Sequence, residues 1–254
     1  MTAVFFAAFF AASPAGSAET AGSAGSSGAS AEENSGGGQT DEFQQFGEFD
    51  EAAPSVYDPL MGYNRVMTRV NDRLYFWVLK PVARGYGAVV PEPARRSVNR
   101  FFKNLGYPVR LVNNLLQAGF RDAAEETLRF GINTTVGIAG LFDPAAKWWD
   151  LSPHPEDFGQ SLGCYGVNGG FHFVLPVLGP SNFRDALARV PDAFLNPVYY
   201  VDDTAVSVGA TVLEKVNRTS LRIGEYESLR KDALDMYILF RNAYEQNRKE
   251  KIEE

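Results

Sequence analysis

The chain has 254 residues, of which 45% are apolar and 13% aromatic, and its net charge is −7. Residues 1–58 contain nine acidic residues and no Lys or Arg, which leaves 22 acidic and 24 basic residues in the remainder. This balanced charge gives no support for binding a polyanion such as nucleic acid. The single Cys excludes an intrachain disulfide, and the two His argue against a Cys/His metal cluster.

The first 56 residues have the composition of a targeting segment followed by a spacer. Residues 3–12 are a ten-residue apolar run, too short to cross a bilayer and typical of a signal-peptide core. Small residues follow, so we predict a signal peptide over 1–18 with cleavage after Ala18. No Lys or Arg precedes the run, and a buried N-terminal helix is the alternative. Residues 19–56 are rich in Gly, Ser and acids, which predicts a disordered linker.

Periodic apolar residues beyond the linker predict a mostly α fold with few or no strands. The first helix is expected to begin at Asp58-Pro59, an N-cap acid followed by Pro, and to end or kink at Pro81. One face of this helix is apolar and the other polar. On pattern alone, this is best explained as a surface helix packed on a soluble core. The apolar residues are Leu60, Tyr63, Met67, Val70, Leu74 and Trp77.

Later helices are predicted from their starts and their apolar stripes, and the predicted ranges are 91–105, from Pro108, 121–133, 203–218 and 226–249. The Gly- and Pro-rich residues 151–183 predict irregular structure with short strands at most. No apolar run after the signal peptide approaches the roughly 20 residues of a spanning helix.

The sequence carries no motif of a common enzyme class. It has neither a phosphate-binding Gly loop followed by Lys-Ser/Thr nor a Gly-x-Ser-x-Gly elbow. We interpret His154 as a solvated loop residue, His172 as a core residue with its hydrogen bonds satisfied, and Cys164 as a small core residue. No catalytic or metal-binding residue is predicted.

Several short segments follow one another in a recognisable order. They are 57–65 (YDPLMGYNR), 80–83 (KPVA), 89–93 (VVPEP), 112–117 (VNNLLQ), 129–134 (RFGINT), 156–163 (EDFGQSLG), 175–181 (LPVLGPS) and then Arg184-Asp185. Each segment is weak alone. Together, over roughly residues 57–248, they resemble the MlaA (VacJ) family of outer-membrane phospholipid-asymmetry proteins.

The resemblance implies a single ring-like domain of amphipathic helices over residues 57–250, with a central channel, on the periplasmic side of the outer membrane. It implies removal of mislocalised phospholipids from the outer leaflet and their transfer to an MlaC-like periplasmic carrier, a retrograde transport that maintains lipid asymmetry. A trimeric porin is a further implied partner. No cofactor and no enzymatic activity are implied.

The resemblance also assigns candidate site residues. Asn71 and Asp72 match a family segment that borders the channel, so gating or head-group contact is expected of them. Gly137 and Gly140 match a glycine-hinged apolar hairpin beside the channel, because glycine permits large dihedral changes. The alternative is that both are plain turn glycines. The lipid-contact residues expected in this hairpin are Ile138, Leu141 and Phe142.

One departure from the family concerns the lipid anchor. Enterobacterial members are usually anchored at a Cys after the signal peptide, and no Cys lies near residue 18. We therefore expect the mature protein to be unacylated and held by its amphipathic helices. The alternative functions are a periplasmic lipid-binding protein, a lipid-hydrolysing enzyme, and a porin-associated structural protein without channel activity.

Overall fold

The computed structural model of the chain describes residues 56–253. The predicted signal peptide at 1–18, and all but the last residue of the predicted linker at 19–56, lie outside the described residues. The described part is mostly helical with one small sheet, which confirms the predicted fold class. The α-helices are α3 (Met61–Leu74), α4 (Lys80–Val89), α5 (Glu92–Leu105), α6 (Tyr107–Leu116), α7 (Phe120–Thr135), α8 (Pro144–Trp149), α9 (Phe158–Cys164), α10 (Phe183–Leu195), α11 (Thr204–Leu221), α12 (Glu225–Asp232) and α13 (Met236–Glu253).

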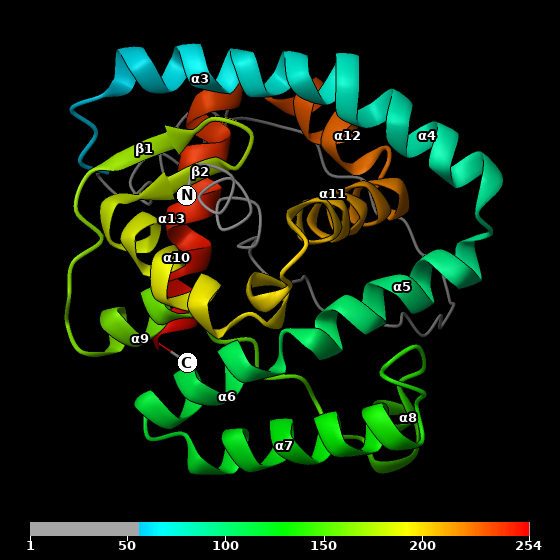
Figure 1. Ribbon diagram of the computed structural model, residues 1–254. Coiled ribbons are helices and arrows are strands. Elements are labelled where there is room, and N and C mark those ends of the chain that lie inside the picture. Colours follow the sequence, from blue (N-terminus) through cyan, green and yellow to red (C-terminus); the bar gives the residue numbers. More distant parts are fainter. Residues whose placement is uncertain (1–55, 254) are drawn as a thin grey trace, which may run out of the picture. The chain divides into compact units, whose positions relative to one another are not determined.

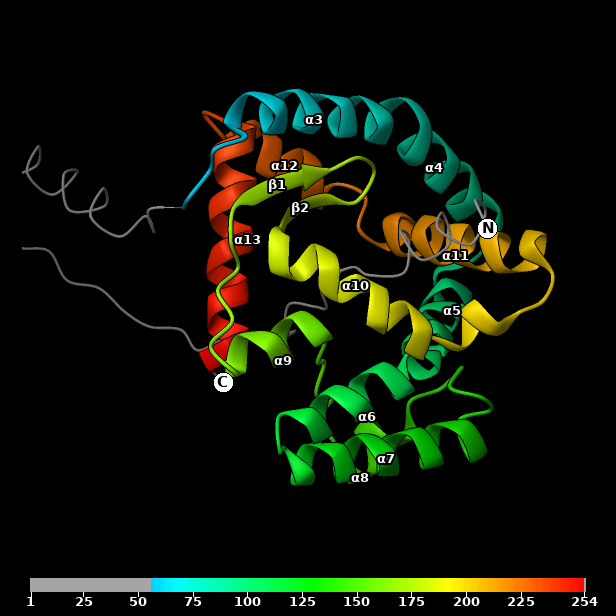
Figure 2. The same ribbon diagram turned by 60° about the vertical axis from the view of Figure 1, so that its left-hand side comes forward.

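Within residues 56–253 the helices follow one another around a ring (Figure 1). Helices α3, α4 and α5 form a continuous arc, and α11 lies inside that arc, packed against α4 and α5. Helices α6 and α7 pair on the side opposite α3, and the view in Figure 2 agrees. None of the helices in this part of the chain is both long and apolar enough to cross a membrane.

The arc from α3 to α4 winds through a π-helix, η2 (Tyr75–Leu79), immediately before Pro81. Lys80 N–H donates to the carbonyl of Tyr75, five residues back. Pro81 has no N–H to donate, so the regular α-helical ladder is interrupted at this point. The break predicted at Pro81 is therefore a local widening of the helix, and the chain continues as α4.

The start of the first helix was predicted too early. Helix α3 begins at Met61, and the residue before it, Leu60, makes no side-chain cap. The carboxylate of Asp58 instead accepts a hydrogen bond from Asn64 Nδ2 at 2.8 Å and one from the hydroxyl of Tyr237 on α13. Asp58 therefore joins two helices rather than capping one.

The region 151–183 is more ordered than predicted. It contains α9, whose first turn is capped by Asp157 accepting from Gln160 N at 2.9 Å, and an antiparallel hairpin. The hairpin strands are β1 (His172–Leu175) and β2 (Gly179–Asn182), with Phe173 opposite Ser181. Helix α10 follows directly and was not predicted. A short 3-10 helix, η3 (Pro197–Tyr200), joins α10 to α11.

The single helix predicted over 226–249 is two helices. Helix α12 ends at Asp232 and α13 begins at Met236. Asp235 accepts backbone hydrogen bonds from Tyr237 N at 2.9 Å and Ile238 N at 3.3 Å, which starts the second helix. The predicted helix is therefore interrupted between Asp232 and Met236.

The interior of the described part is polar. Nineteen polar or charged residues are buried there, against nine apolar ones, and five of those nine are the small residue Ala. Many large apolar side chains are exposed instead, including Trp77 at 76% and Val89 at 82%. A soluble globular domain buries its large apolar side chains, so this distribution is the reverse of the usual one.

Candidate functional site

Asn71 fastens α3 to the turn of the β1–β2 hairpin. Its Nδ2 donates to the carbonyl of Leu175 at 2.9 Å, and its Oδ1 accepts from Val177 N at 2.7 Å. Val177 has a positive φ of 68°, a conformation that costs a β-branched residue energy. The hydrogen bond that Asn71 donates and the one that it accepts hold the strained turn against α3.

Asp72 joins α3 to α12. Its carboxylate accepts from the hydroxyl of Tyr226 at 3.2 Å and lies 3.5 Å from the guanidinium of Arg230. The next turn of the arc is tied to the same helix, because Glu227 pairs with Lys80 at 2.5 Å and accepts from the hydroxyl of Tyr75 at 3.2 Å. Asn71 and Asp72 therefore attach the hairpin and α12 to α3.

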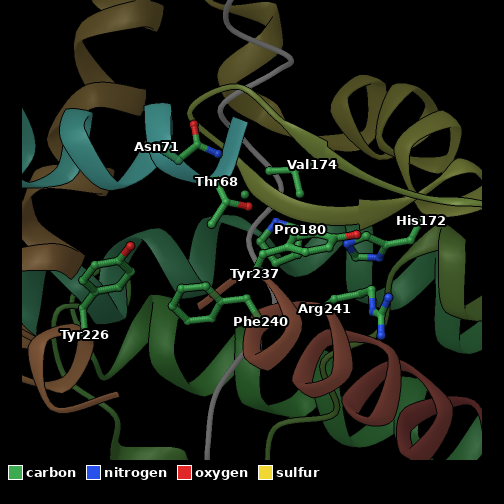
Figure 3. Close-up of a pocket in the computed structure, with 10 residues that line it drawn as sticks. Thr68, Asn71, His172, Val174, Pro180, Tyr226, Tyr237, Phe240 and Arg241 are labelled. Atoms are coloured by element: carbon green, nitrogen blue, oxygen red, sulfur yellow. The ribbon is translucent and has the colours of Figure 1, made fainter. Parts of the chain in front are cut away.

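A cavity of about 130 Å³ lies between α3, the hairpin, α12 and α13 (Figure 3). Asn71 and Thr68 line it from α3, and Tyr226 and Phe240 line it from the C-terminal helices. The buried His172 also lines it, with Nδ1 2.8 Å from Glu245 and Nε2 without a hydrogen-bond partner among the described residues. The prediction that His172 lies in the core is confirmed, but only one of its two ring nitrogens is satisfied.

The other predicted site segment, residues 136–142, is a tight turn between α7 and α8. Gly137 N donates to the carbonyl of Ile132 at 3.1 Å, and Gly140 N donates to that of Asn133 at 2.7 Å. Ile138 and Ala139 both have positive φ values, 53° and 55°. The turn therefore stores backbone strain and is held by hydrogen bonds to the end of α7.

Neither glycine of this turn leaves room for a side chain. A Cβ at Gly137 would lie 2.5 Å from the carbonyl oxygen of Asn133, and one at Gly140 would lie 2.4 Å from Cβ of Asn104 on α5. Ile138 is 60% exposed and Phe142 55%, as expected of lipid-contact residues, whereas Leu141 is half-buried. The hinge role of the glycines stays a prediction.

The predicted site residues do not form one cluster. Asn71 and Asp72 lie on α3, and the α7–α8 turn lies on the side of the ring opposite α3 in both views (Figures 1 and 2). Any common role would link two separate parts of the ring.

Sequence reasoning missed a buried polar network that joins α6, α9 and α10. Asn113 Nδ2 donates to Asp192 Oδ1 at 3.0 Å, and its Oδ1 accepts from Ser161 Oγ at 3.0 Å. Burial, and secondarily the charge of Asp157, raise the pKa of Asp192 to about 7. The segment 112–117, which carries part of the family resemblance, contains Asn113. Its residue types alone did not show that the amide side chains face inward.

Arg248 of α13 completes this network. Its guanidinium is bidentate with Asp157, at 2.7 and 2.8 Å, and also binds Asp185 of α10 at 2.8 Å. Asp185 is buried, and although burial opposes its ionisation, Arg248 and Arg184 hold its pKa below the ordinary value. The C-terminal helix is thus tied to α9 and α10 by ionic hydrogen bonds rather than by apolar packing.

Two further sequence interpretations are corrected. Cys164 is exposed, with Sγ 3.1 Å from Gln117 Oε1, because it lies at the end of the short helix α9 rather than in the core. His154 is half-buried rather than simply solvated, since its Nε2 lies 3.0 Å from Glu125 on α7.

Comparisons of this chain with known proteins all indicate the same family. The family model described as MlaA lipoprotein matches residues 56–251. An intermembrane phospholipid transport system lipoprotein MlaA of Escherichia coli is 34% identical over 192 residues, covering 74% of this chain and 75% of the relative. The protein of the same description from Haemophilus influenzae is 32% identical over 201 residues, covering 77% and 79%.

A protein of Rickettsia felis is 33% identical over 199 residues, covering 78% of this chain and 79% of that protein. A solved structure described as the structural basis for maintenance of bacterial outer membrane lipid asymmetry superimposes with a TM-score of 0.68 at 31% identity. It covers 77% of this chain and 98% of the solved one, so the ring of helices is shared with that protein.

Proposed function

Because this chain belongs to the MlaA lipoprotein family, we propose that it removes mislocalised phospholipids from the outer leaflet of the outer membrane. It passes them to an MlaC-like periplasmic carrier for retrograde transport, and it maintains lipid asymmetry in this way. The relatives' names describe phospholipid transport, not catalysis. We accordingly assign the chain no catalytic step.

The observation that carries the proposal is the reversed distribution of polar and apolar side chains. Moving a lipid head group through hydrocarbon without hydrogen-bond partners costs several kcal/mol, on the order of 2–7 for each polar group. A ring with exposed apolar side chains and a polar interior offers a lower-energy path. Exposed Trp77, Val78 and Val82 on the arc meet the first requirement, and the mostly polar set of buried residues supports the second.

The localisation follows from the same surfaces. The exposed apolar side chains of the arc and of the α7–α8 turn would seat the ring in the periplasmic side of the outer membrane. A trimeric porin would cover the part of this apolar surface that lipid does not cover. Asn71 and Asp72 would gate the passage through the hairpin and α12, and Gly137 and Gly140 would let the apolar turn move.

Reconstitution tests the function. The purified chain is placed in vesicles with a fluorescent phospholipid in one leaflet, and transfer to a purified MlaC-like carrier is measured. We expect intact lipid to reach the carrier. Release of fatty acid would instead identify an enzyme, retention of all lipid in the vesicle would identify a structural protein, and full release of the chain by a salt wash would identify a soluble lipid carrier.

A further inference from the structure

The cavity between α3, the hairpin, α12 and α13 contains a buried hydrogen-bond acceptor that lacks a donor (Figure 3). His172 is 1% exposed, and its Nδ1 lies 2.8 Å from a carboxylate oxygen of Glu245. In the neutral ring this bond places the proton on Nδ1, so Nε2 carries a lone pair and no proton. Among residues 56–253, nothing donates to that lone pair. An acceptor left in this state destabilises a fold unless a ligand or a water satisfies it.

The hydroxyl groups that line the cavity do not supply the missing donor, because each already donates its proton elsewhere. Thr68 donates to a backbone carbonyl one turn earlier on α3, at 2.9 Å. The hydroxyls of Tyr226 and Tyr237 donate to the carboxylates of Asp72 and Asp58. The cavity therefore presents acceptors, and a ligand that enters it has to bring its own proton donor.

The other walls of the cavity are mostly carbon. Val174 and Pro180 line it from the hairpin, and Phe240 lines it from α13, with its ring stacked on that of Tyr226 at 5.5 Å between centroids. Arg241 also lines the cavity, but its guanidinium is paired with a carboxylate at 3.4 Å. Apolar walls with a compensated charge favour a neutral ligand over an ion.

The size of the cavity limits the ligand to about one ring. Its volume is about 130 Å³, and an apolar protein cavity of about 150 Å³ binds benzene. Figure 3 shows the ring of His172 beside Pro180 and Tyr237, with the ring of Phe240 farther along the cavity. A ligand bonded to Nε2 would therefore have its apolar part among the aromatic side chains.

We propose that this cavity binds a small neutral molecule with an apolar ring and one hydroxyl group, the chemistry of a phenol, and that the hydroxyl donates to Nε2 of His172. The ligand would contact α3, the hairpin and α12, which Asn71 and Asp72 attach to one another. Its binding would stabilise that arrangement. This site goes beyond the proposed function and does not depend on it.

Nuclear magnetic resonance of the full chain in detergent micelles, labelled with ¹⁵N-histidine, tests the site. The chain has only two histidines, so His154 is an internal control for His172. The probes are phenol and toluene, which has nearly the same size but no donor. We expect phenol, and not toluene, to move the Nε2 signal of His172 as an accepted hydrogen bond does, with saturation, while His154 stays unchanged. A shift of both histidines or of neither would overturn the site, and the second result is expected of a cavity that holds only water.

Two variants separate the acceptor from the space. His172→Asn keeps a nitrogen that can donate to Glu245 but removes Nε2, so calorimetric titration should show a Kd for phenol about tenfold higher, equal to about 1.4 kcal/mol, and an unchanged Kd for toluene. Thr68→Leu fills the cavity from α3 and should abolish binding of both probes, which decides the test where His172→Asn fails to fold. Thr135→Leu removes a hydroxyl bonded to a carbonyl four residues back, as in Thr68, but on α7, and should change neither Kd.

Equal losses of phenol and toluene binding in His172→Asn would show that the hydroxyl is not recognised, and unchanged binding in Thr68→Leu would place the probes elsewhere. A lipid head group could supply the same hydroxyl chemistry. Displacement of phenol by dihexanoylphosphatidylglycerol, but not by dihexanoylphosphatidic acid, which lacks the head-group hydroxyls, would overturn the small-molecule site in favour of a lipid one. We expect neither lipid to displace phenol.

Discussion

At the scale of single residues, the carboxyl of Asp192 couples folding to pH. Its pKa in the folded chain is raised to about 7, chiefly by burial, whereas in the unfolded chain it titrates near pH 4. The folded chain therefore binds an extra proton between about pH 4 and 7. The stability that this proton provides is complete below pH 4 and is lost as the pH rises through 7. Glu156, whose pKa burial also raises to about 7, acts in the same direction.

Asp192→Asn should flatten this dependence. The wild type is expected to lose about 2 kcal/mol of unfolding free energy through Asp192 between pH 5 and 8. An Asn keeps an oxygen that accepts from Asn113 and from Phe158 N, so the fold is retained. Urea denaturation in detergent micelles at both pH values measures the difference. Asp202→Asn, at an exposed position, is the control, and equal slopes for Asp192→Asn and the wild type would contradict the assignment.

At the scale of elements, the turn after α7 depends on two glycines whereas α7 itself does not. Gly140 has a φ of 86°, and a Cβ there meets Asn104, so Gly140→Ala should destabilise by about 1–2 kcal/mol or more. Gly137→Ala meets backbone oxygens and should also destabilise. Gly131 inside α7 has open space, so Gly131→Ala should stabilise by about 1 kcal/mol. Denaturation midpoints of the three variants check the signs.

These variants also refine the hinge hypothesis. Proline at Gly137 or Gly140 would remove an N–H that donates to α7, so a loss of transport in a Pro variant would report misfolding as readily as a blocked hinge. Alanine keeps that donor. Equal stability of all three Ala variants would show that the turn is not held as described.

A second element-scale prediction concerns the attachment of α13. Arg248→Met leaves Asp157 and Asp185 without their shared partner and should cost about 3–5 kcal/mol. Lys at this position cannot reproduce the bidentate pairing and should rescue little. Lys249→Met, next to it on the exposed surface, serves as the control. Limited proteolysis should cut within α13 in the Arg248 variant first, and equal protection of both variants would argue against the clamp.

How far the sequence predicted the elements depends on what stabilises each one. Long periodic helices such as α5, α7 and α11 were predicted nearly to their ends, because their apolar stripes, the Pro at the start of α5 and the Asp203 cap of α11 are local signals. Helix α9 was missed because it is seven residues long and contains two glycines, and it is held by Asp157 and by tertiary contacts to α6. Short helices of this kind depend on partners that a sequence window does not contain.

Periodicity also defined faces without saying which one is buried. In α6 the stripe that includes Leu115 and Leu116 is apolar, yet both residues are exposed while Asn113 and Asn114 are buried. The resemblance to a membrane family was what indicated that the apolar face is the exposed one. The sequence predicted individual site residues but not the network around them. The charged residues of that network, such as Arg248 and Asp157, come from parts of the chain that lie far apart in the sequence, so no sequence spacing relates them.

At the scale of the whole molecule, all three tryptophans of the chain report on the exposed apolar surface. Trp77 is 76% exposed, Trp148 62% and Trp149 53%. Tryptophan favours the membrane interface because its indole is apolar and its N–H is polar.

If the ring of helices is seated in a bilayer, the intrinsic tryptophan fluorescence should be quenched by brominated phospholipids and protected from aqueous acrylamide. Trp148→Phe combined with Trp149→Phe isolates Trp77 on the arc, and Trp77→Phe isolates the α8 pair. Vesicles of unbrominated lipid provide the baseline for each variant. Strong acrylamide quenching at both positions, with no effect of bromine, would mean that the apolar face lies in water rather than in lipid.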